Sequence, residues 1–530
     1  MVPRRCARPW PRPVRGLSRF TRGVLFALSV LSFAGAGEAQ TLRARLNADI
    51  RSIDPASNLR DENTDMVLQH MLEGLVAFRE DASIGPLLAE KVEVSDDGKT
   101  YTFTLRDGVR FHNGAVLTSE DVLWSWKRYL DPAGKWRCQP ELSGGVAKIL
   151  DIAAKDARTV VFTIDRPSAL FLVTLARPDC GGSAIVHRDS VDADGKWKAP
   201  IGTGPFRFGE WRRDQYVELV RYDGYARREG PRDGFTGGKV AMVERVRFNI
   251  IPDPSAARAA LLSGGLDATD ISTNEYDDVK GRREVKVSVS PTMAFAAILM
   301  QTNDPLLKDV RIRRALALAI NTPELVDAVT VGLAKPNNSP VPPSSPWYSA
   351  TLATGFKRDL AQAKKLLAEA GYKGQAIKLI ANKRYSYMFD AAVLAQAMAA
   401  EAGIKIDVEV QDWASQLDRY SRGDYQAMAF GYSARLDPAL SYEVFSGPKA
   451  TQPRKVWDNP QVEELLRESM RSSDAARRQA IFDELHRRLI DEVPLIALFN
   501  PVEIAAVRAN VEGYAGWPAA MRRFWGVSLK

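Results

Sequence analysis

The sequence predicts an α/β fold, and three observations support that prediction. Residues 101–105 alternate apolar and polar side chains, which is the period-two pattern of a half-buried strand. Residues 404–410 show the same alternation. A short strand at 377–380 and a helix at about 389–402 precede this second alternating segment. A strand, a helix and a strand of these lengths are typical of a βαβ crossover between parallel strands.

The remaining elements follow from local start and stop signals. A turn at 95–98 precedes the first strand, and a helix at about 120–130 follows it, with Thr118 or Ser119 as its cap and Pro132 after its end. The other predicted elements are a strand at 160–164 and helices at about 254–264, 359–371 and 474–491. Asp253 is the expected cap of the first of these helices, and the other two begin at Asp359 and at Asp474.

The net charge of the chain is concentrated at its N-terminus. The 530 residues contain 73 Lys and Arg against 65 Asp and Glu, a net charge of +8. Residues 1–22 hold seven arginines, and the apolar run at 24–34 and the small residues ending at Ala39 complete the pattern of a secretory signal peptide at 1–39. An N-terminal anchor helix and cleavage after Ala36 are the alternatives. Removing residues 1–39 leaves 66 basic and 64 acidic residues, a net charge of only +2, so the mature chain offers little basic excess for nucleic acid.

The three cysteines bear on export and on stability. Cys6 precedes the apolar run, whereas a lipid-attachment cysteine would follow it, so we do not expect a lipoprotein. Cys138 and Cys180 fall in one segment, and in an exported protein they can form a disulfide. Two buried free thiols are the alternative.

The sequence offers little that indicates catalysis. None of the four histidines has a partner at metal-ligand spacing, Glu93 replaces the first glycine of a P-loop, and Arg435 replaces the last glycine of a nucleophile elbow. We therefore expect no catalytic residue, no metal and no cofactor. The aromatic residues Trp413, Tyr432 and Tyr442 lie near Arg435, which indicates either a ligand cleft or core packing.

Many segments resemble a known family of transport proteins. In chain order they are IDP at 53–55, LEGL at 72–75, LLAE at 87–90, SDDGKTYTFTLR at 95–106, GVRFHNG at 108–114, TSEDV at 118–122, IGTGPF at 201–206, SGGLD at 263–267, residues 303–319 with VRIRRAL, AEAGY at 368–372 and EVP at 492–494. This series closely resembles the family 5 extracellular solute-binding proteins of ABC importers, which bind dipeptides, oligopeptides and nickel. The likeness covers nearly the whole chain after residue 39.

The resemblance implies a periplasmic-binding-protein-like fold of two lobes around a cleft, with three domains in all. Domain I would comprise residues 40–80, 200–300 and 495–530, domain II residues 81–199, and domain III residues 301–494. Hinge closure of domain III would enclose the solute. The implied protein is an exported, periplasmic monomer that delivers its solute to an inner-membrane ABC permease and binds no nucleic acid.

The resemblance also implies ligand-binding residues. Trp413 lies where the family commonly has a tryptophan in the cleft. Tyr432 keeps an aromatic residue at a second position, but Arg435 replaces the acid that many peptide-binding members use for the amino terminus, with Asp437 two residues later. Arg60 stands where oligopeptide binders can place another acid. We expect Arg435 to bind an anionic or hydroxyl-rich group. An ion pair between Arg435 and Asp437 is the alternative.

The sequence therefore predicts the substrate-binding subunit of an ABC importer that captures a peptide. An opine, a glycoside or another small organic anion is the next substrate class. From other classes of protein, a secreted hydrolase would need a nucleophile and a base that the sequence does not reveal, and a periplasmic chaperone or signalling module would bind an unfolded chain or a sensor.

Overall fold

The computed structural model describes residues 40–530 except 58, 60 and 135. The predicted signal peptide and Arg60 therefore lie outside the described residues. Among the residues that are described, no helix is both long enough and apolar enough to cross a membrane.

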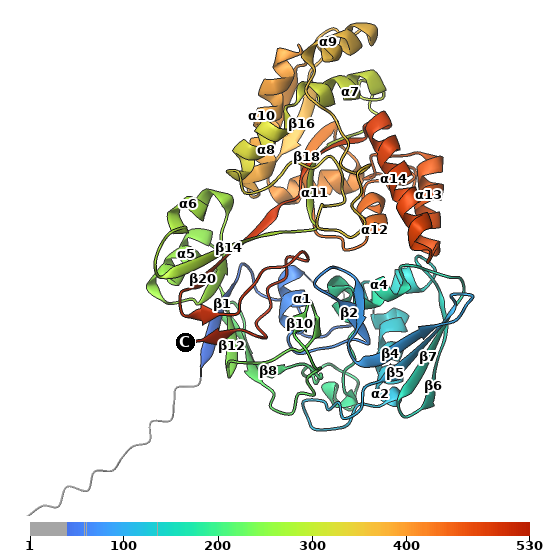
Figure 1. The fold of residues 1–530 in the computed structure, drawn as a ribbon, viewed down its shortest axis with the longest axis vertical. Coiled ribbons are helices and arrows are strands. Elements are labelled where there is room, and N and C mark those ends of the chain that lie inside the picture. Colours follow the sequence, from blue (N-terminus) through green and yellow to red (C-terminus); the bar gives the residue numbers. More distant parts are fainter. Residues whose placement is uncertain (1–39, 58, 60, 135) are drawn as a thin grey trace, which may run out of the picture. The chain divides into compact units, whose positions relative to one another are not determined.

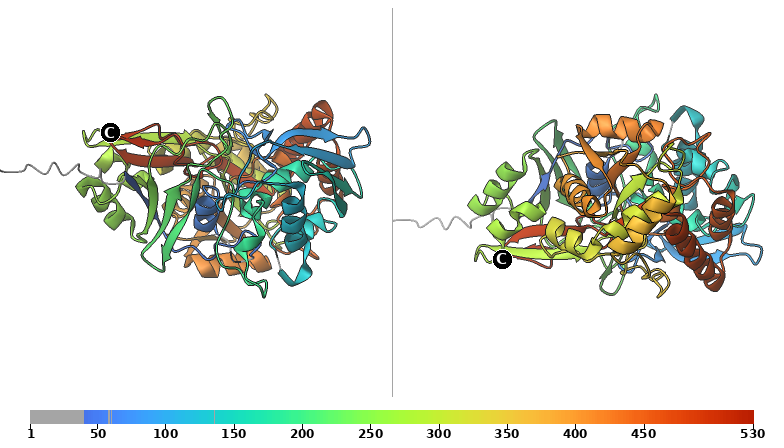
Figure 2. Two further views of the ribbon diagram at one scale, coloured as in Figure 1. Left: turned by 90° about the horizontal axis from the view of Figure 1, so that it is seen from below. Right: turned by 90° about the horizontal axis from the view of Figure 1, so that it is seen from above.

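The largest sheet has seven strands drawn from three distant segments of the chain. Their order is β14 (Val285–Pro291), β20 (Val502–Arg508), β13 (Ala268–Asp270), β1 (Thr41–Leu46), β12 (Arg245–Ile250), β9 (Tyr216–Arg221) and β8 (Phe206–Arg212). β1 runs parallel to β12 and β13, and the other pairs are antiparallel. The blue N-terminal strand and the red C-terminal strand thus share one sheet with the green middle strands (Figures 1 and 2). The helix α5 (Pro254–Ser263) packs on β13 and β20, with Asp253 as its cap as predicted.

A second sheet of four antiparallel strands contains the first predicted strand. Its order is β4 (Ala89–Val94), β5 (Thr100–Leu105), β7 (Thr159–Ile164) and β6 (Ile149–Asp156). The apolar residues of β5 are buried, which confirms the alternation read from the sequence. The helix α2 (Ser119–Leu130) packs on β6 and β7. Thr118, not Ser119, is its cap, in a capping box with Asp121.

The third sheet contains the predicted βαβ unit. Its order is β17 (Ile406–Val410), β16 (Ile377–Ala381), β18 (Ala427–Tyr432), β15 (Phe295–Met300) and β19 (Leu495–Phe499). β16 lies parallel to β17, and the helix α10 (Ser386–Glu401) connects them, which confirms the crossover. α10 begins three residues before the predicted start. The helix α8 (Thr322–Thr330) packs on β19, and α7 (Val310–Ala319) packs on α10 and on α9 (Leu360–Glu369). The helix α14 (Ala475–Glu492) lies beside α13 (Pro460–Arg471) (Figure 1).

Two short segments carry the chain between the first and third sheets. Residues 292–294 join β14 to β15, and residues 500–501 join β19 to β20. The segments bond to each other: Asn500 Nδ2 donates to the Ala294 carbonyl at 2.8 Å, and the Thr292 hydroxyl donates to the Pro501 carbonyl at 2.6 Å. The division into domains stays a prediction. Because β15 and β19 hydrogen-bond in the third sheet, we propose boundaries within these two segments in place of residues 300 and 495.

Cys138 and Cys180 form a disulfide in the structure, with Cα atoms 5.6 Å apart. The bridge closes a loop of 42 residues between the end of α2 and the segment Pro178–Ser183. Both cysteines are fully buried, and the Trp136 indole donates to the Cys180 carbonyl at 3.2 Å. This bridge therefore holds the segment that carries Asp179, a residue of the candidate site described below.

We expect the intact protein to show no titratable thiol at Cys138 or Cys180 after denaturation without reductant. Reduction should lower the free energy of unfolding by about 2–4 kcal/mol, because the closed loop restricts the unfolded chain. A thiol titration and denaturant unfolding with and without reductant measure both quantities. Two free thiols in the non-reduced sample would establish the alternative of unpaired cysteines.

Candidate functional site

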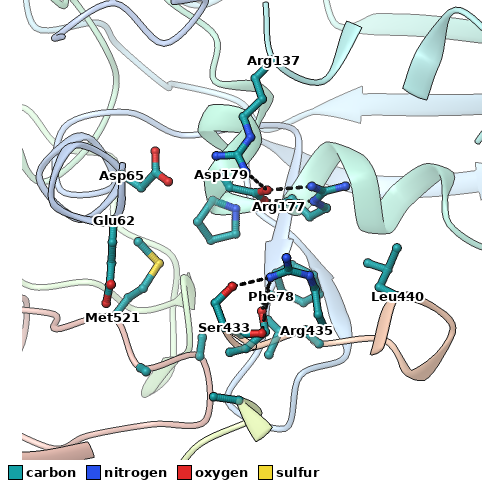
Figure 3. A pocket seen from close by; sticks show the side chains of 16 residues that line it. Glu62, Asp65, Phe78, Arg137, Arg177, Asp179, Ser433, Arg435, Leu440 and Met521 are labelled. Carbon is teal, nitrogen blue, oxygen red and sulfur yellow. Dashed lines mark hydrogen bonds and ion pairs between the residues drawn. The ribbon is translucent and has the colours of Figure 1, made fainter. Parts of the chain in front are cut away.

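Two adjoining cavities, of about 360 and 660 Å³, lie among residues that come from segments near each of the three sheets. Both are lined by Glu62, Ala294, Ser433, Arg435, Ala520 and Met521. We call them the smaller and the larger cavity. Figure 3 shows the smaller one, with Glu62 and Asp65 on one side and with Arg137, Arg177 and Arg435 around Asp179 on the other. Acidic and basic groups thus face one shared space.

Arg435 reaches the cavities because β18 ends just before it. The strand is buried up to Tyr432, and the chain then turns through residues 433–435. The Arg435 guanidinium donates to the Ser433 hydroxyl at 2.7 Å and to the Ala434 carbonyl at 3.2 Å, both neutral acceptors. Among the described residues, no carboxylate forms an ion pair with it. Burial lowers the pKa of Arg435, and the charge of Asp179 acts in the opposite direction.

Asp179, by contrast, is already ion-paired with two arginines. The Arg177 guanidinium donates to both of its carboxylate oxygens, at 3.0 and 2.7 Å, and also to Glu141 at 2.5 Å. Arg137 lies 3.7 Å from the same carboxylate. Burial opposes ionisation of Asp179, but the hydrogen bonds and charge of Arg177 outweigh it and lower the pKa of Asp179. Asp179 therefore stays charged and fixes Arg177, while Arg435 keeps unused hydrogen-bonding capacity.

The acidic side of the cavities centres on Glu62, the first residue of α1 (Glu62–Leu68). Its side chain opens onto both cavities and has no hydrogen-bond or ion-pair partner among the described residues. Nearby protein atoms limit the hydration of the Glu62 carboxylate and so raise its pKa. The charge of Arg522 opposes this effect, and the charges of Asp270, Glu503 and Asp65 add to it. A cation placed beside Glu62 would therefore offset the repulsion from the neighbouring carboxylates.

An aromatic wall lines the larger cavity. Its members are Tyr385, Tyr387, Trp413, Tyr420, Phe430 and Tyr432. The Trp413 ring stacks on Phe430 with centroids 5.8 Å apart, and Tyr385 meets Trp413 edge-on at 5.0 Å. Gly431 leaves room for the Tyr387 side chain of this wall, because a Cβ atom at position 431 would lie 2.0 Å from the Tyr387 hydroxyl. Arg454 also lines this cavity.

The structure brings together three of the residues predicted from the sequence. Trp413, Tyr432 and Arg435 line the larger cavity. Asp437 lines neither cavity: both of its oxygens accept from Arg478, at 2.8 and 2.9 Å, and one also caps the helix α12 (Pro438–Glu443). The alternative ion pair between Arg435 and Asp437 is therefore not the one in the structure. Tyr442 is fully buried in the core, and the roles of the predicted residues in binding stay predictions.

Several lining residues gave no signal in the sequence. Glu62, Asp179, Arg177 and Arg454 belong to none of the predicted patterns, and they come from segments far apart in the chain. The one usable hint was that two acids, Asp61 and Glu62, directly follow Arg60. Among the described residues, no group of three or more His, Cys, Asp or Glu side chains could hold a metal ion.

Comparison with known proteins places the chain in a family. The model of "bacterial extracellular solute-binding proteins, family 5 Middle" matches residues 83–452. The heme-binding protein A of Haemophilus influenzae is 27% identical over 512 residues, covering 90% of each chain.

Solved structures agree. The periplasmic binding protein AgaA of A. tumefaciens R10, in complex with agropinic acid, has a TM-score of 0.73 and 28% identity over 92% of this chain and 99% of its own. The DppA protein of Helicobacter pylori, in complex with the peptide STSA, has a TM-score of 0.75 and 26% identity over 92% and 98%. These likenesses confirm the family and the two-lobed α/β fold expected from the sequence. The chain belongs to the family 5 bacterial extracellular solute-binding proteins and is the substrate-binding subunit of an ABC importer.

Proposed function

We propose that the chain captures a small zwitterionic solute, with a short peptide as the leading class. The observation that carries this proposal is the pair of unpartnered, opposite charges that share the two cavities: Glu62 on one side and Arg435 on the other (Figure 3). An ammonium group beside Glu62 and a carboxylate beside Arg435 would satisfy both. A peptide carries these two groups at its ends.

Of the other substrate classes, an opine would fit both charged residues, whereas a glycoside or heme would leave at least one of them without a partner. An opine, as a zwitterion with extra carboxylates, would satisfy the same two residues, and agropinic acid is the ligand of the similar AgaA structure. A neutral glycoside would leave both Glu62 and Arg435 without a charged partner. Heme, the ligand in the name of the similar Haemophilus protein, carries no ammonium group for Glu62.

The same site supports binding without turnover. The cavities present ion-pairing groups and aromatic faces, which suits a carrier that encloses a solute and releases it. Closure would swing the third sheet about residues 292–294 and 500–501, and solute that binds both sides would favour the closed state. We further propose an exported monomer, cleaved after Ala39 and without a lipid anchor, that binds no nucleic acid. Product formation from the bound solute would instead favour a hydrolase, and binding of unfolded chains a chaperone.

Native mass spectrometry of protein isolated from its own periplasm tests the substrate class. We expect a co-purified solute with at least one amino group and at least one carboxylate. A neutral solute, or one with cationic groups alone, would contradict the proposal. The same spectrum gives the mass of the mature chain and its oligomeric state.

We expect Arg435→Gln to weaken binding of the co-purified solute about 10- to 100-fold, which corresponds to the loss of a charge-assisted hydrogen bond. Isothermal titration calorimetry measures the change. Arg422→Gln is the matched control, because Arg422 is exposed, pairs with Asp418 at 2.7 Å and lines neither cavity. Equal affinities of Arg435→Gln and the intact protein would exclude Arg435 from the binding site.

We expect binding to release protons just above the ordinary glutamate pKa of about 4.3. The pKa of Glu62 is raised in the empty protein, so part of this group is protonated there, and an ammonium group would favour its ionised form. Affinity should therefore rise with pH through this window. Calorimetry in two buffers of different ionisation enthalpy counts the protons, and Glu62→Gln should abolish the release whereas Glu93→Gln, on the exposed strand β4, should not. Proton uptake on binding would contradict this assignment.

A further inference from the structure

Arg454 is a second arginine on the cavity surface without a carboxylate partner among the described residues. Its guanidinium donates to the Tyr420 hydroxyl at 3.4 Å, a neutral acceptor. The nearby acid Glu443 is already engaged, because the buried Lys455 ammonium lies 2.5 Å from its carboxylate. Arg454 therefore faces the larger cavity without an ion-pair partner of its own among the described residues.

The hydroxyl groups next to Arg454 do not supply a negative charge to balance it. Tyr420 and Tyr432 are buried, and their hydroxyls lie 3.3 Å apart. Burial raises the pKa of Tyr432 well above its ordinary value, so this hydroxyl stays neutral. A partly buried cation next to phenol hydroxyls is a favourable site for an anion, which would accept hydrogen bonds from both the guanidinium and a phenol.

The space between Arg454 and the charged pair Glu62 and Arg435 has flat walls. Trp413, Tyr385 and Tyr432 line it, and the larger cavity of about 660 Å³ exceeds what a single carboxylate would fill. Aromatic walls favour a flat apolar body, which gains from stacking or edge contacts. The larger cavity thus offers two arginines without a carboxylate partner among the described residues, Arg435 and Arg454, around an aromatic compartment. Glu62, Asp270, Glu503 and Arg522 line it as well, and Arg522 pairs with Asp270 at 3.4 Å.

We propose that Arg454 binds a second anionic group of the solute, carried on a planar or apolar body that lies against the aromatic wall. This inference rests on the proposed zwitterionic substrate and narrows it. The preferred solute has one ammonium group for Glu62, one carboxylate for Arg435 and one further anionic group for Arg454. Acidic peptides with a ring-bearing side chain and polycarboxylate opines share this chemistry.

Two dipeptide probes isolate the second anionic group. Alanyl-4-carboxyphenylalanine and alanyl-4-carbamoylphenylalanine have the same free termini and nearly the same shape, and only the first has a carboxylate on its ring. We expect the intact protein to bind the carboxy probe about 10-fold more tightly than the carbamoyl probe in calorimetry. Arg454→Met should reduce this preference to about 2-fold or less.

Three further variants make the result specific. Arg454→Lys keeps the charge but loses the planar donor array, so it should keep part of the preference and show that folding is intact. Arg435→Gln should weaken both probes by a similar factor and leave the preference unchanged. Arg422→Met, on the exposed face of α11 (Trp413–Arg422), should change neither affinity.

Each outcome separates this inference from the proposed function. Equal affinities of the two probes in the intact protein, or a preference that survives Arg454→Met, would overturn the role of Arg454 while leaving a zwitterion-binding protein. Failure of the intact protein to bind either probe would overturn the peptide-like substrate itself, and the Arg454 subsite with it.

Discussion

Replacing Lys239 by methionine should lower the free energy of unfolding by about 3–5 kcal/mol. The Lys239 ammonium lies 2.9 Å from a carboxylate oxygen of Glu73, and the exposed fractions of the two side chains are 1% and 0%. Glu73 also accepts from the Tyr225 and Thr203 hydroxyls, each at 3.0 Å. Without Lys239, the protein would have to bury the Glu73 charge without a cation or protonate it, and both cost free energy.

Denaturant unfolding with the disulfide intact measures the loss. The double variant Glu73→Leu, Lys239→Met should recover most of it, because removing both charges also removes the cost of burying them. Lys91→Met is the matched control: Lys91 pairs with Glu93 at 2.7 Å, but both side chains are more than half exposed, and we expect a change below about 1 kcal/mol. A loss from Lys239→Met no larger than the control would show that water or other groups compensate Glu73.

This buried pair illustrates what the sequence could not reveal. Glu73 stands in the segment LEGL at 72–75, but its partner Lys239 is 166 residues away, and no local pattern connects them. The elements that the sequence did predict depend on neighbouring residues. An N-terminal cap and an apolar stripe define α5, α9 and α14, and strict alternation defines β5, so each could be inferred within a short window.

The candidate site divides in the same way. Trp413, Tyr432 and Arg435 lie within one stretch of the chain around β18, and a resemblance along that stretch was enough to select them. Glu62 comes from the start of α1, and Asp179 from the segment held by the disulfide. Because the fold alone brings these segments to one cavity, the sequence could hint at an acid beside position 60 but could not place Glu62 opposite Arg435 or show the ion pair between Asp179 and Arg177.

Asp437 shows a local signal that was present and outweighed. Asp437 followed by Pro438 is the same pattern as Asp253 followed by Pro254, which correctly predicted the start of α5. A proline at the first helical position and an aspartate before it favour a helix start. Because Asp437 lies two residues after Arg435, the sequence suggested that Asp437 contacts the ligand. In the structure, the turn into α12 directs the Asp437 carboxylate to Arg478 instead.

We therefore expect Asp437→Ala to lower stability by about 3–5 kcal/mol while leaving the affinity of the folded protein for its solute unchanged. Asp437 and Arg478 form a buried ion pair at 2.8 Å, and the Arg478 guanidinium also lies 4.8 Å from the Trp347 ring centroid. Without the carboxylate, the arginine stays buried with no anionic partner, keeping only aromatic faces and the Ser469 carbonyl, and α12 loses its cap.

Denaturant unfolding and calorimetry on the same preparation separate the two effects. Asp474→Ala is the control, because Asp474 caps α14 at an exposed position without an ion pair to a buried arginine, and its loss should cost only about 0.5–2 kcal/mol. A fall in affinity for Asp437→Ala that exceeds its effect on the folded fraction would return Asp437 to the binding site. A cost no greater than that of Asp474→Ala would mean that Asp437 stabilises the protein through the cap of α12 and not through its charge on Arg478. The arginine would then be stabilised mainly by Trp347 and by the Ser469 carbonyl, to which it donates at 2.8 Å.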